Sequence, residues 1–431
     1  MRMISVLAVA ACCIGPATAA TYQVGPGGEY ETLQDVCELL TPGDVVEVAG
    51  DATYPGDVTL TKSGTAERRI TIRGLRKNGR RPIISGGEIG VHFDRANYCI
   101  LEGFEIEGAS ARGIRHRAAF TTIRDTYVHD CPDQGILGSD TMSGSLTLEY
   151  VEVARCGGPP GGHQIYVSTD PVAFPGAVFR MQHCYIHDAS WGNAVKTRCE
   201  RNEIYSNWVE SNSLRALVLI GRDQEAGPRP MHSDVVGNVL INSSNLPVVQ
   251  IGHDGRYFGS RGRYRLVNNT FILSEECPTA IQARWHLESV EMHNNVFYHL
   301  GGEPIEILNE DTADWTTGER ICAGQHNWVA EGATCPPEWT GTIVGRDPGF
   351  ANVAGYDLHL APQSPLMGAG PRDFAGAPGY PFPDPLPRPA FIPPSRGVET
   401  VGSARPRSAE SMVDIGAFPF EPSAGVARRA E

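Results

Sequence analysis

Residues 266–272 read LVNNTFI, and variants of this phrase recur along the middle of the chain. They read LEGFEI at 101–106, IRDTYVH at 123–129, MQHCYIH at 181–187, VVGNVLI at 235–241 and MHNNVFY at 292–298. One position of each phrase forms a column whose successive steps are 23, 24, 34, 23, 31, 31, 26 and 32 residues. A period of about 20 to 50 residues indicates stacked structural repeats. The column consists of Gly103, Thr126, Tyr150, Cys184, Asn207, Asn238, Asn269, Asn295 and Asn327.

Each repeat contains short alternating strands and glycine-containing turns, and it leaves no room for a helix. We therefore expect an all-β protein in which every repeat is one rung of a β-solenoid. The composition fits, because 49 glycines among 431 residues supply the turns that each rung needs. With 41% hydrophobic residues the chain can form a continuous core, and a solenoid of this length can remain one unit.

The first 20 residues have the pattern of an export signal, with Arg2, a short apolar run and small residues up to Ala20. A second interpretation stays open, because Val9–Cys12 also resembles a lipoprotein cleavage box that would leave a lipid on Cys12. No later stretch has about 18 consecutive apolar residues, so we expect no membrane span. The sequence thus predicts a secreted, periplasmic or cell-surface protein, which we expect to be a monomer.

Cysteine usage leaves two interpretations open. The chain has 11 cysteines, of which two lie in the leader, so the nine that remain cannot all pair within one molecule. Cys322 with Cys335 and Cys131 with Cys156 could form disulfides in an oxidising compartment. Alternatively, the cysteines are buried thiols stacked between rungs. None of them has zinc-ligand spacing, and we infer no metal site from them.

A net charge of −14 argues against nucleic acid as a partner, because phosphates require a basic binding surface. The charge is uneven, since residues 196–265 contain ten Lys and Arg against seven Asp and Glu. A basic middle on an acidic chain suits an anionic ligand such as a uronate polymer. Scattered, solvated arginines would give the same count.

The rungs need atypical units at their ends, because a solenoid must cover its open hydrophobic core. Leu33–Leu40 has apolar residues at helical spacing, with Thr32 as N-cap and Asp35 in a capping-box position. We expect this helix to be the N-terminal cap. The units have the following expected bounds: signal peptide 1–20, N-terminal cap and first strands 21–62, β-helix rungs 63–345, closing segment with a Pro-rich insertion 346–420, and disordered tail 421–431.

Each rung offers a second strand after its turn, and one face of these strands is expected to line an exposed surface. Side chains alternate between faces, so Ile165, Val195, Leu217, Val249 and Ile281 are placed in the core. The outward column then consists of Arg115, Leu137, Tyr166, Lys196, Val218, Gln250, Gln282 and Glu306. The asparagines of the repeat column are expected to form a structural ladder at a turn, where Asn tolerates left-handed geometry and stacked amides bond one another.

Several motifs resemble the right-handed parallel β-helix proteins of the pectate-lyase-like superfamily. The N-terminal marks are Val24–Gly27 and Pro42–Asp44, and the resemblance extends over about Thr21–Phe420. It implies a single-stranded right-handed parallel β-helix. The superfamily includes polysaccharide lyases, uronate epimerases, glycoside hydrolases and non-catalytic surface proteins, so the fold alone does not fix the function. The closing marks are Asp347–Phe350, Asp357–Leu360, Ser364–Leu366 and Asp414–Phe418.

Two neighbouring strands are more specific. Gly162–Val167 reads GHQIYV and Gly192–Arg198 reads GNAVKTR, which resembles a subgroup with G-H-x-I-Y-V and G-H-x-x-K-S-R strands. The sequence departs from that pattern at Asn193, where His is expected, and at Thr197, where Ser is expected. The resemblance implies activity on a polysaccharide.

The same strands suggest the chemistry of β-elimination, which needs a neutralised carboxylate, a base and a proton donor. In the expected register Lys196 and Arg198 point the same way, about 6.6 Å apart, and Tyr166 lies one rung away at about 4.8 Å. We predict Lys196 as the base, Arg198 as the carboxylate clamp, and Tyr166 or His163 as the proton donor. Predicted substrate contacts are Arg222, Gln250, His253, Arg256 and Arg284.

Other functions remain open. Glycosidases need two carboxylates about 5 to 9.5 Å apart, and these strands show no such pair. A uronate carbon-5 epimerase shares the first half of the elimination, and a non-catalytic glycan-binding protein would need no base. Calcium could replace Arg as the neutralising group, but we see no compact Asp/Glu site, so we predict no cofactor. The His129-Asp130 and His187-Asp188 pairs are interpreted as structural turns.

Overall fold

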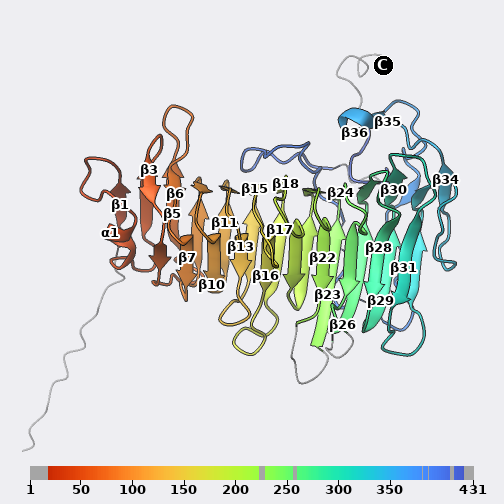
Figure 1. The fold of residues 1–431 in the computed structure, drawn as a ribbon, viewed down its shortest axis with the longest axis horizontal. Helices are drawn as coiled ribbons and strands as arrows, with labels where there is room; N and C mark the ends of the chain where they lie inside the picture. Colours follow the sequence, from red (N-terminus) through yellow and green to blue (C-terminus); the bar gives the residue numbers. More distant parts are fainter. Residues whose placement is uncertain are drawn as a thin grey trace, which may run out of the picture.

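The computed structural model describes residues 18–222, 229–255, 260–380, 382–386, 388–407 and 412–421. The expected signal peptide and tail, together with Cys12, lie almost wholly outside these ranges. Within them, parallel strands stack rung upon rung into one elongated solenoid, with the N-terminal strands at one end and β34 at the other (Figure 1). This is the all-β architecture that the repeat period predicts.

The solenoid has three long parallel sheets, which we number in order of their first strands. Sheet 1 contains β1 (Thr21–Val24), β2 (Val45–Ala49), β5 (Ile70–Leu75), β8 (Cys99–Glu102), β11 (Thr121–Arg124), β14 (Leu146–Glu149), β17 (Val178–Gln182), β20 (Arg201–Tyr205), β23 (Arg229–Val236), β26 (Ser260–Val267), β29 (Leu287–His293) and β32 (Cys322–Gln325). Sheet 2 contains β3 (Thr53–Pro55), β6 (Ile83–Ser85), β9 (Glu105–Glu107), β12 (Tyr127–His129), β15 (Glu152–Ala154), β18 (Tyr185–His187), β21 (Trp208–Ser211), β24 (Val239–Asn242), β27 (Thr270–Leu273), β30 (Val296–His299), β33 (Trp328–Ala330) and β34 (Ile343–Gly345). Sheet 3 contains β4 (Val58–Leu60), β7 (Ile89–Asp94), β10 (Arg112–Arg117), β13 (Gln134–Gly138), β16 (His163–Ser168), β19 (Val195–Arg198), β22 (Leu217–Ile220), β25 (Val249–Gly252), β28 (Thr279–Arg284) and β31 (Glu306–Thr312).

Each complete rung therefore has three strands, one more than the two we expected. The recurring phrase is not one strand but two, because it bends between sheets 1 and 2. In LVNNTFI, β26 ends at Val267 and β27 begins at Thr270. Asn268 at the bend has a φ of 52°, in the left-handed region that Asn tolerates better than most residues. The bend thus explains why the phrase combines two apolar runs around polar residues.

The asparagine ladder is confirmed. The Oδ1 of Asn238 accepts from both the backbone N and the Nδ2 of Asn207, each at 2.9 Å. The same pattern continues through Asn269, Asn295 and Asn327, and all five are buried. The left-handed conformation, however, falls on the preceding residue of each rung, not on the ladder asparagine as we expected. The ladder residues are selected for their amide bonds, since buried polar groups must be paired.

The inward and outward faces of sheet 3 follow the alternation predicted from the sequence. Ile165, Val195, Leu217, Val249 and Ile281 are in register and buried in the core. The outward column is also in register from Arg115 to Gln282, but its next member is Asn309 and not Glu306. Glu306 instead pairs with Thr279, because β31 begins only at Glu306. The expected exposure is not continuous along this column, because Val218 and Gln250 are buried.

The two ends differ in detail from expectation. The helix α1 spans only Gln34–Cys37, and Leu33, not Thr32, is its N-cap. Asp35 does contribute the capping-box hydrogen bond, since its carboxylate accepts from the backbone N of Thr32 at 2.8 Å. Figure 1 shows α1 beside β1 at the N-terminal end. The closing segment contains β35 (Phe350–Asn352), η1 (Val353–Gly355), β36 (Asp357–Leu360), β37 (Gly370–Pro371) and β38 (Met412–Val413).

All nine cysteines of the described chain are free thiols, eight of them buried and Cys335 partly so. The alternative of stacked, buried thiols is therefore the correct one, and the two expected disulfides are not formed. Burial raises the pKa of the Cys184 and Cys199 thiols to about 12, so these thiols stay protonated and pack as small apolar groups.

Candidate functional site

The candidate site lies on the outward face of sheet 3, where β16 and β19 are adjacent. Tyr166 is in register with Lys196, and Ser168 with Arg198. Because side chains two residues apart on a strand share a face, Lys196 and Arg198 project together from β19. The Lys196 ammonium also lies 5.4 Å from the centre of the Tyr166 ring. The structure thus brings together the three residues that the two motifs singled out.

A carboxylate that sequence reasoning missed lies between the two cations. The Oδ2 of Asp254 accepts from the Nζ of Lys196 at 3.1 Å and from the Nη2 of Arg198 at 2.9 Å. Its Oδ1 accepts from the Nε2 of Gln250 at 3.0 Å. Burial alone would raise the pKa of Asp254, but the two neighbouring cations outweigh burial and hold this pKa below its usual value. Asp254 is therefore ionised at neutral pH.

Hydrogen bonds of the His253 side chain fix the loop that carries Asp254. The His253 side chain is fully buried; its Nδ1 accepts from the backbone N of Gly255 at 2.9 Å, and its Nε2 donates to the carbonyl of Arg222 at 3.1 Å. His253 was predicted to contact substrate; in this structure its side chain is buried and bonded to the backbone of its own loop and of Arg222. One feature of the sequence could have pointed to Asp254. It belongs to a His-Asp pair between two glycines, at residues 252–255, directly after the strand β25.

His163 begins β16 and is buried against the same cluster. Its Nδ1 accepts from the backbone N of Asn193 at 3.0 Å, so its proton is on Nε2. Burial, with a smaller effect from Lys196, lowers the pKa of His163 to about 4. Its ring meets that of Tyr166 edge-on, with 5.5 Å between centroids. At neutral pH His163 is thus a neutral imidazole that orients Tyr166.

Asn193, where the motif led us to expect His, connects three parts of the site. Besides its bond to His163, its Oδ1 accepts from the backbone N of Arg215 at 3.1 Å. Arg215 precedes β22, and its Nη2 donates to the Oε1 of Gln282 on β28 at 3.0 Å. Sequence reasoning also missed Arg215, because it lies outside any strand.

The other residues that were predicted to contact substrate do not lie together in one place. Arg284 ends β28, beside Arg215, and Gln250 is buried and binds Asp254. Arg222 directs its Nη2 to the carbonyl of Asp140 at 3.0 Å. Arg256 lies outside the described residues. The site that the structure assembles therefore consists of Lys196 and Arg198 around Asp254, with Arg215 and Arg284 as a neighbouring pair.

A second group of charged side chains lies on another sheet. Among the described residues, Glu105, Glu107 and His129 are close enough to one another to hold a metal ion. They belong to β9 and β12 of sheet 2, away from Lys196. The arrangement of a histidine between carboxylates recurs at His187 with Glu152 and Asp188. We therefore interpret it as a structural feature of this sheet.

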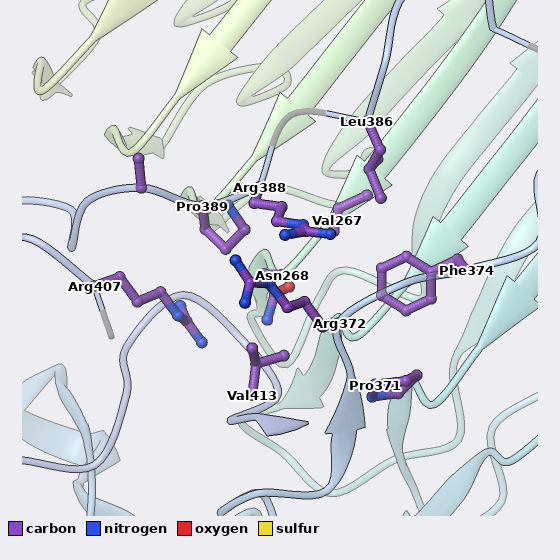
Figure 2. A pocket seen from close by; sticks show the side chains of 11 residues that line it. Val267, Asn268, Pro371, Arg372, Phe374, Leu386, Arg388, Pro389, Arg407 and Val413 are labelled. Carbon is purple, nitrogen blue, oxygen red and sulfur yellow. The ribbon is translucent and has the colours of Figure 1, made fainter. Parts of the chain in front are cut away.

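A cavity of about 270 Å³ lies where the Pro-rich segment crosses the end of β26 (Figure 2). Arg372, Arg388 and Arg407 point toward it, together with Asn268 and Phe374. Arg407 is buried and donates to the carbonyls of Asp414, Gly416 and Ala417, which fixes the chain that closes the solenoid. This cavity is thus a seam between the closing segment and the solenoid, and it is not part of sheet 3.

Comparisons with known proteins agree with the fold. A family model described as a right handed beta helix region matches residues 78–271. No curated protein matches the sequence. In the described part of the chain, no helix is long and apolar enough to cross a membrane.

Solved structures give the same result. Pectate lyase Pel9A is similar with a TM-score of 0.56 and 11% identity, over 94% of this chain and 98% of that one. XylC, solved in complex with xylose, has a TM-score of 0.51 and 11% identity, over 77% and 87% of the two chains. An alginate lyase from Paenibacillus sp. str. FPU-7 has 15% identity over 76% and 98%, but its TM-score is 0.45. The chain therefore has a right-handed parallel β-helix fold. Identities this low show the fold and not the reaction.

Proposed function

We propose that this protein is a lyase that cleaves a uronate-containing polysaccharide by β-elimination on the outward face of sheet 3. One observation carries the proposal: Lys196 and Arg198 bind the same carboxylate oxygen, at 3.1 and 2.9 Å. A uronate presents the same chemical group as Asp254. The site therefore has the donors that a sugar carboxylate needs, on the outward face of β19, where Lys196 is partly exposed and Arg198 is buried.

The charge balance supports an anionic substrate. Among the residues that the structure describes, Lys196, Arg198, Arg215 and Arg284 carry four positive charges on this part of sheet 3, against one negative charge on Asp254. Like charges held close together on a partly buried surface repel one another, and an incoming anion relieves this repulsion. An excess of cations fits a uronate polymer better than a neutral glycan.

In the proposed mechanism the sugar carboxylate takes the place of Asp254 at Arg198 and Gln250. Arg198 neutralises its charge, so that the proton on the adjacent carbon 5 becomes acidic. Lys196, separated from Asp254, is the base that accepts the proton from carbon 5. The electrons of the C–H bond form the double bond between carbons 4 and 5. The bond from carbon 4 to the leaving oxygen then breaks, and that oxygen receives a proton.

Tyr166 is the better candidate for that proton donor. Its register with Lys196 places it one strand away, and a phenol has an acidic proton to give. His163 was the alternative, but its pKa of about 4 leaves it neutral at pH 7, and a neutral imidazole is a far weaker acid. We therefore assign His163 the orientation of Tyr166. The predicted export signal agrees with action on polysaccharide outside the cytoplasm.

The test is absorbance in the unsaturated-uronate band while the purified protein acts on pectate, alginate, glucuronan, hyaluronan and heparan-type polymers. We expect a rise with at least one polymer that disappears in Lys196→Ala. Lys62→Ala is the matched control, because Lys62 forms a surface pair with Glu38 near the N-terminal end. A rise that persists in Lys196→Ala would overturn the assignment. A flat trace on every polymer would replace the lyase with an epimerase or a binding protein, which proton exchange at carbon 5 would separate.

A further inference from the structure

A pair of arginines lies beside the Asp254 site without a carboxylate of its own. Arg215 extends from the chain before β22 to Gln282 on β28, and Arg284 lies two residues after Gln282 on the same strand. Among the described residues, neither arginine forms an ion pair with Asp or Glu within 4 Å. The Nε atoms of both are shielded from solvent and have no hydrogen-bond partner there.

The two guanidinium groups are close enough to oppose each other. Burial lowers the pKa of Arg215, and the charge of Arg284 lowers it further, while Asp254 has only a small opposing effect. Elsewhere in this protein, buried arginines are held by acceptors, as Arg265 is by Asp234 and Arg407 is by three backbone carbonyls. A fixed pair of donors with this excess of charge fits an anion that the protein itself does not supply.

The pair has a defined position relative to the first site. Asp254 contacts side chains of both β19 and β25, so its carboxylate lies near β22, the strand between them. Gln282 and Arg284 belong to β28, two strands further along sheet 3. At about 4.8 Å per strand the separation is about 10 Å, roughly the length of two pyranose rings in an extended chain.

We propose that Arg215 and Arg284 bind a second carboxylate of the same polysaccharide chain. This inference rests on the proposed function and makes its substrate more specific. The substrate is a polyanion in which carboxylated sugars recur on one side of the chain, about every second ring. A polymer with isolated uronates would fill only the site at Lys196 and Arg198.

The test compares the binding of uronate trimers and monomers by calorimetry, using trigalacturonate with galacturonate and the mannuronate trimer with its monomer. We expect the wild type to bind one trimer more tightly than its monomer. In Arg215→Gln and in Arg284→Gln this ratio falls about ten- to hundredfold, the factor that a charge-assisted hydrogen bond contributes. Arg215→Lys restores part of it. Arg180→Gln is the matched control, because Arg180 is an exposed sheet 1 residue paired with Glu203.

Two outcomes would overturn the inference, and they are distinguishable. If the wild type binds a trimer but both variants keep the full trimer-to-monomer ratio, the second subsite is wrong and the lyase proposal stands. If no uronate of either length binds the wild type, the proposed function fails, and the second subsite fails with it. A circular dichroism melt of each variant excludes loss of folding as the cause of a lower ratio.

Discussion

Two clusters on this solenoid are both built on ion pairs between arginine and aspartate. They differ in the balance of positive and negative charge and in how far solvent reaches the aspartate. On sheet 1, Arg265 binds both oxygens of Asp234 at 2.6 and 3.0 Å, and Arg201 binds one of them as well. The Asp234 side chain is fully buried, and the Phe382 ring covers Arg265 at 3.8 Å. On sheet 3, the Asp254 side chain is 36% exposed, and Lys196 and Arg198 both bind it.

The difference separates a structural cluster from a binding site. Arg201 also reaches Glu203 and Asp384, and Arg180 pairs with Glu203, so three cations face three carboxylates in this cluster. Arg265 further donates to the carbonyls of Asp384 and Pro385, which attaches the closing segment to sheet 1. On sheet 3 the positive charge is in excess and the carboxylate remains accessible. An ion pair that is complete and covered fixes the fold, whereas an incomplete and open one can exchange its anion.

The largest effect is expected from Asp234→Ala. This change leaves Arg201 and Arg265 buried without their main counter-ion, which should lower the free energy of unfolding by about 3 to 5 kcal/mol. Chemical denaturation followed by circular dichroism measures the change. Asp254→Ala is the matched variant on sheet 3, and it should lower stability by less than about 1 kcal/mol, because that pair is partly solvated. Equal losses in the two variants would contradict the comparison.

Lys196→Met should remove activity and leave the fold intact. Loss of a general base lowers the turnover rate by about 100- to 10,000-fold, whereas the apolar methionine preserves the packing beside Tyr166. The measurement is the rate of unsaturated-product formation on whichever polymer the wild type cleaves. A variant that keeps more than a tenth of the wild-type rate with an unchanged melting curve would show that the base lies elsewhere.

The state of His163 gives a pH dependence. With a folded pKa of about 4, it stays neutral where the unfolded chain, with an ordinary pKa of 6.5, binds a proton. The unfolded state therefore binds more protons between pH 6.5 and 4, and stability falls as the pH is lowered through this window. At pH 5 the loss from this residue is about 2 kcal/mol. His163→Gln should flatten that part of the stability profile, and a variant with the wild-type slope would show that His163 is protonated in the folded protein.

The sequence was sufficient to predict the orientation and register of those site residues that lie on strands. The faces of Tyr166, Lys196 and Arg198 follow from alternation, and the rung-to-rung register follows from the repeat. The three-strand rung was missed because Asn268 and its counterparts bend the chain inside a phrase that looks like one strand. Glu306 was misplaced because no period marks where β31 begins after its turn, and Asn309 takes the position beside Gln282.

Asp254 and Arg215 could not be placed because both lie outside the strands. Asp254 is 58 residues from Lys196 along the chain, and Arg215 is 67 residues from Gln282. No local pattern restricts where a turn residue of one rung meets a strand of another. These contacts depend on the length of each inserted loop, which varies between rungs. The sequence therefore predicts the site's cations better than its anion.

The smallest of these effects, and the most direct test of an exchangeable anion, is expected from Asp254→Asn. Asparagine keeps the shape of the side chain but gives Lys196 and Arg198 no charge to bind, so a uronate no longer competes with an internal carboxylate. We expect the KM for the cleaved polymer to fall by about tenfold, the effect of about 1.4 kcal/mol, with a smaller change in kcat. Steady-state kinetics at low salt measures both. If KM rises instead, Asp254 holds the two cations in place for the substrate, and the sheet 3 cluster is then as fixed as the one on sheet 1.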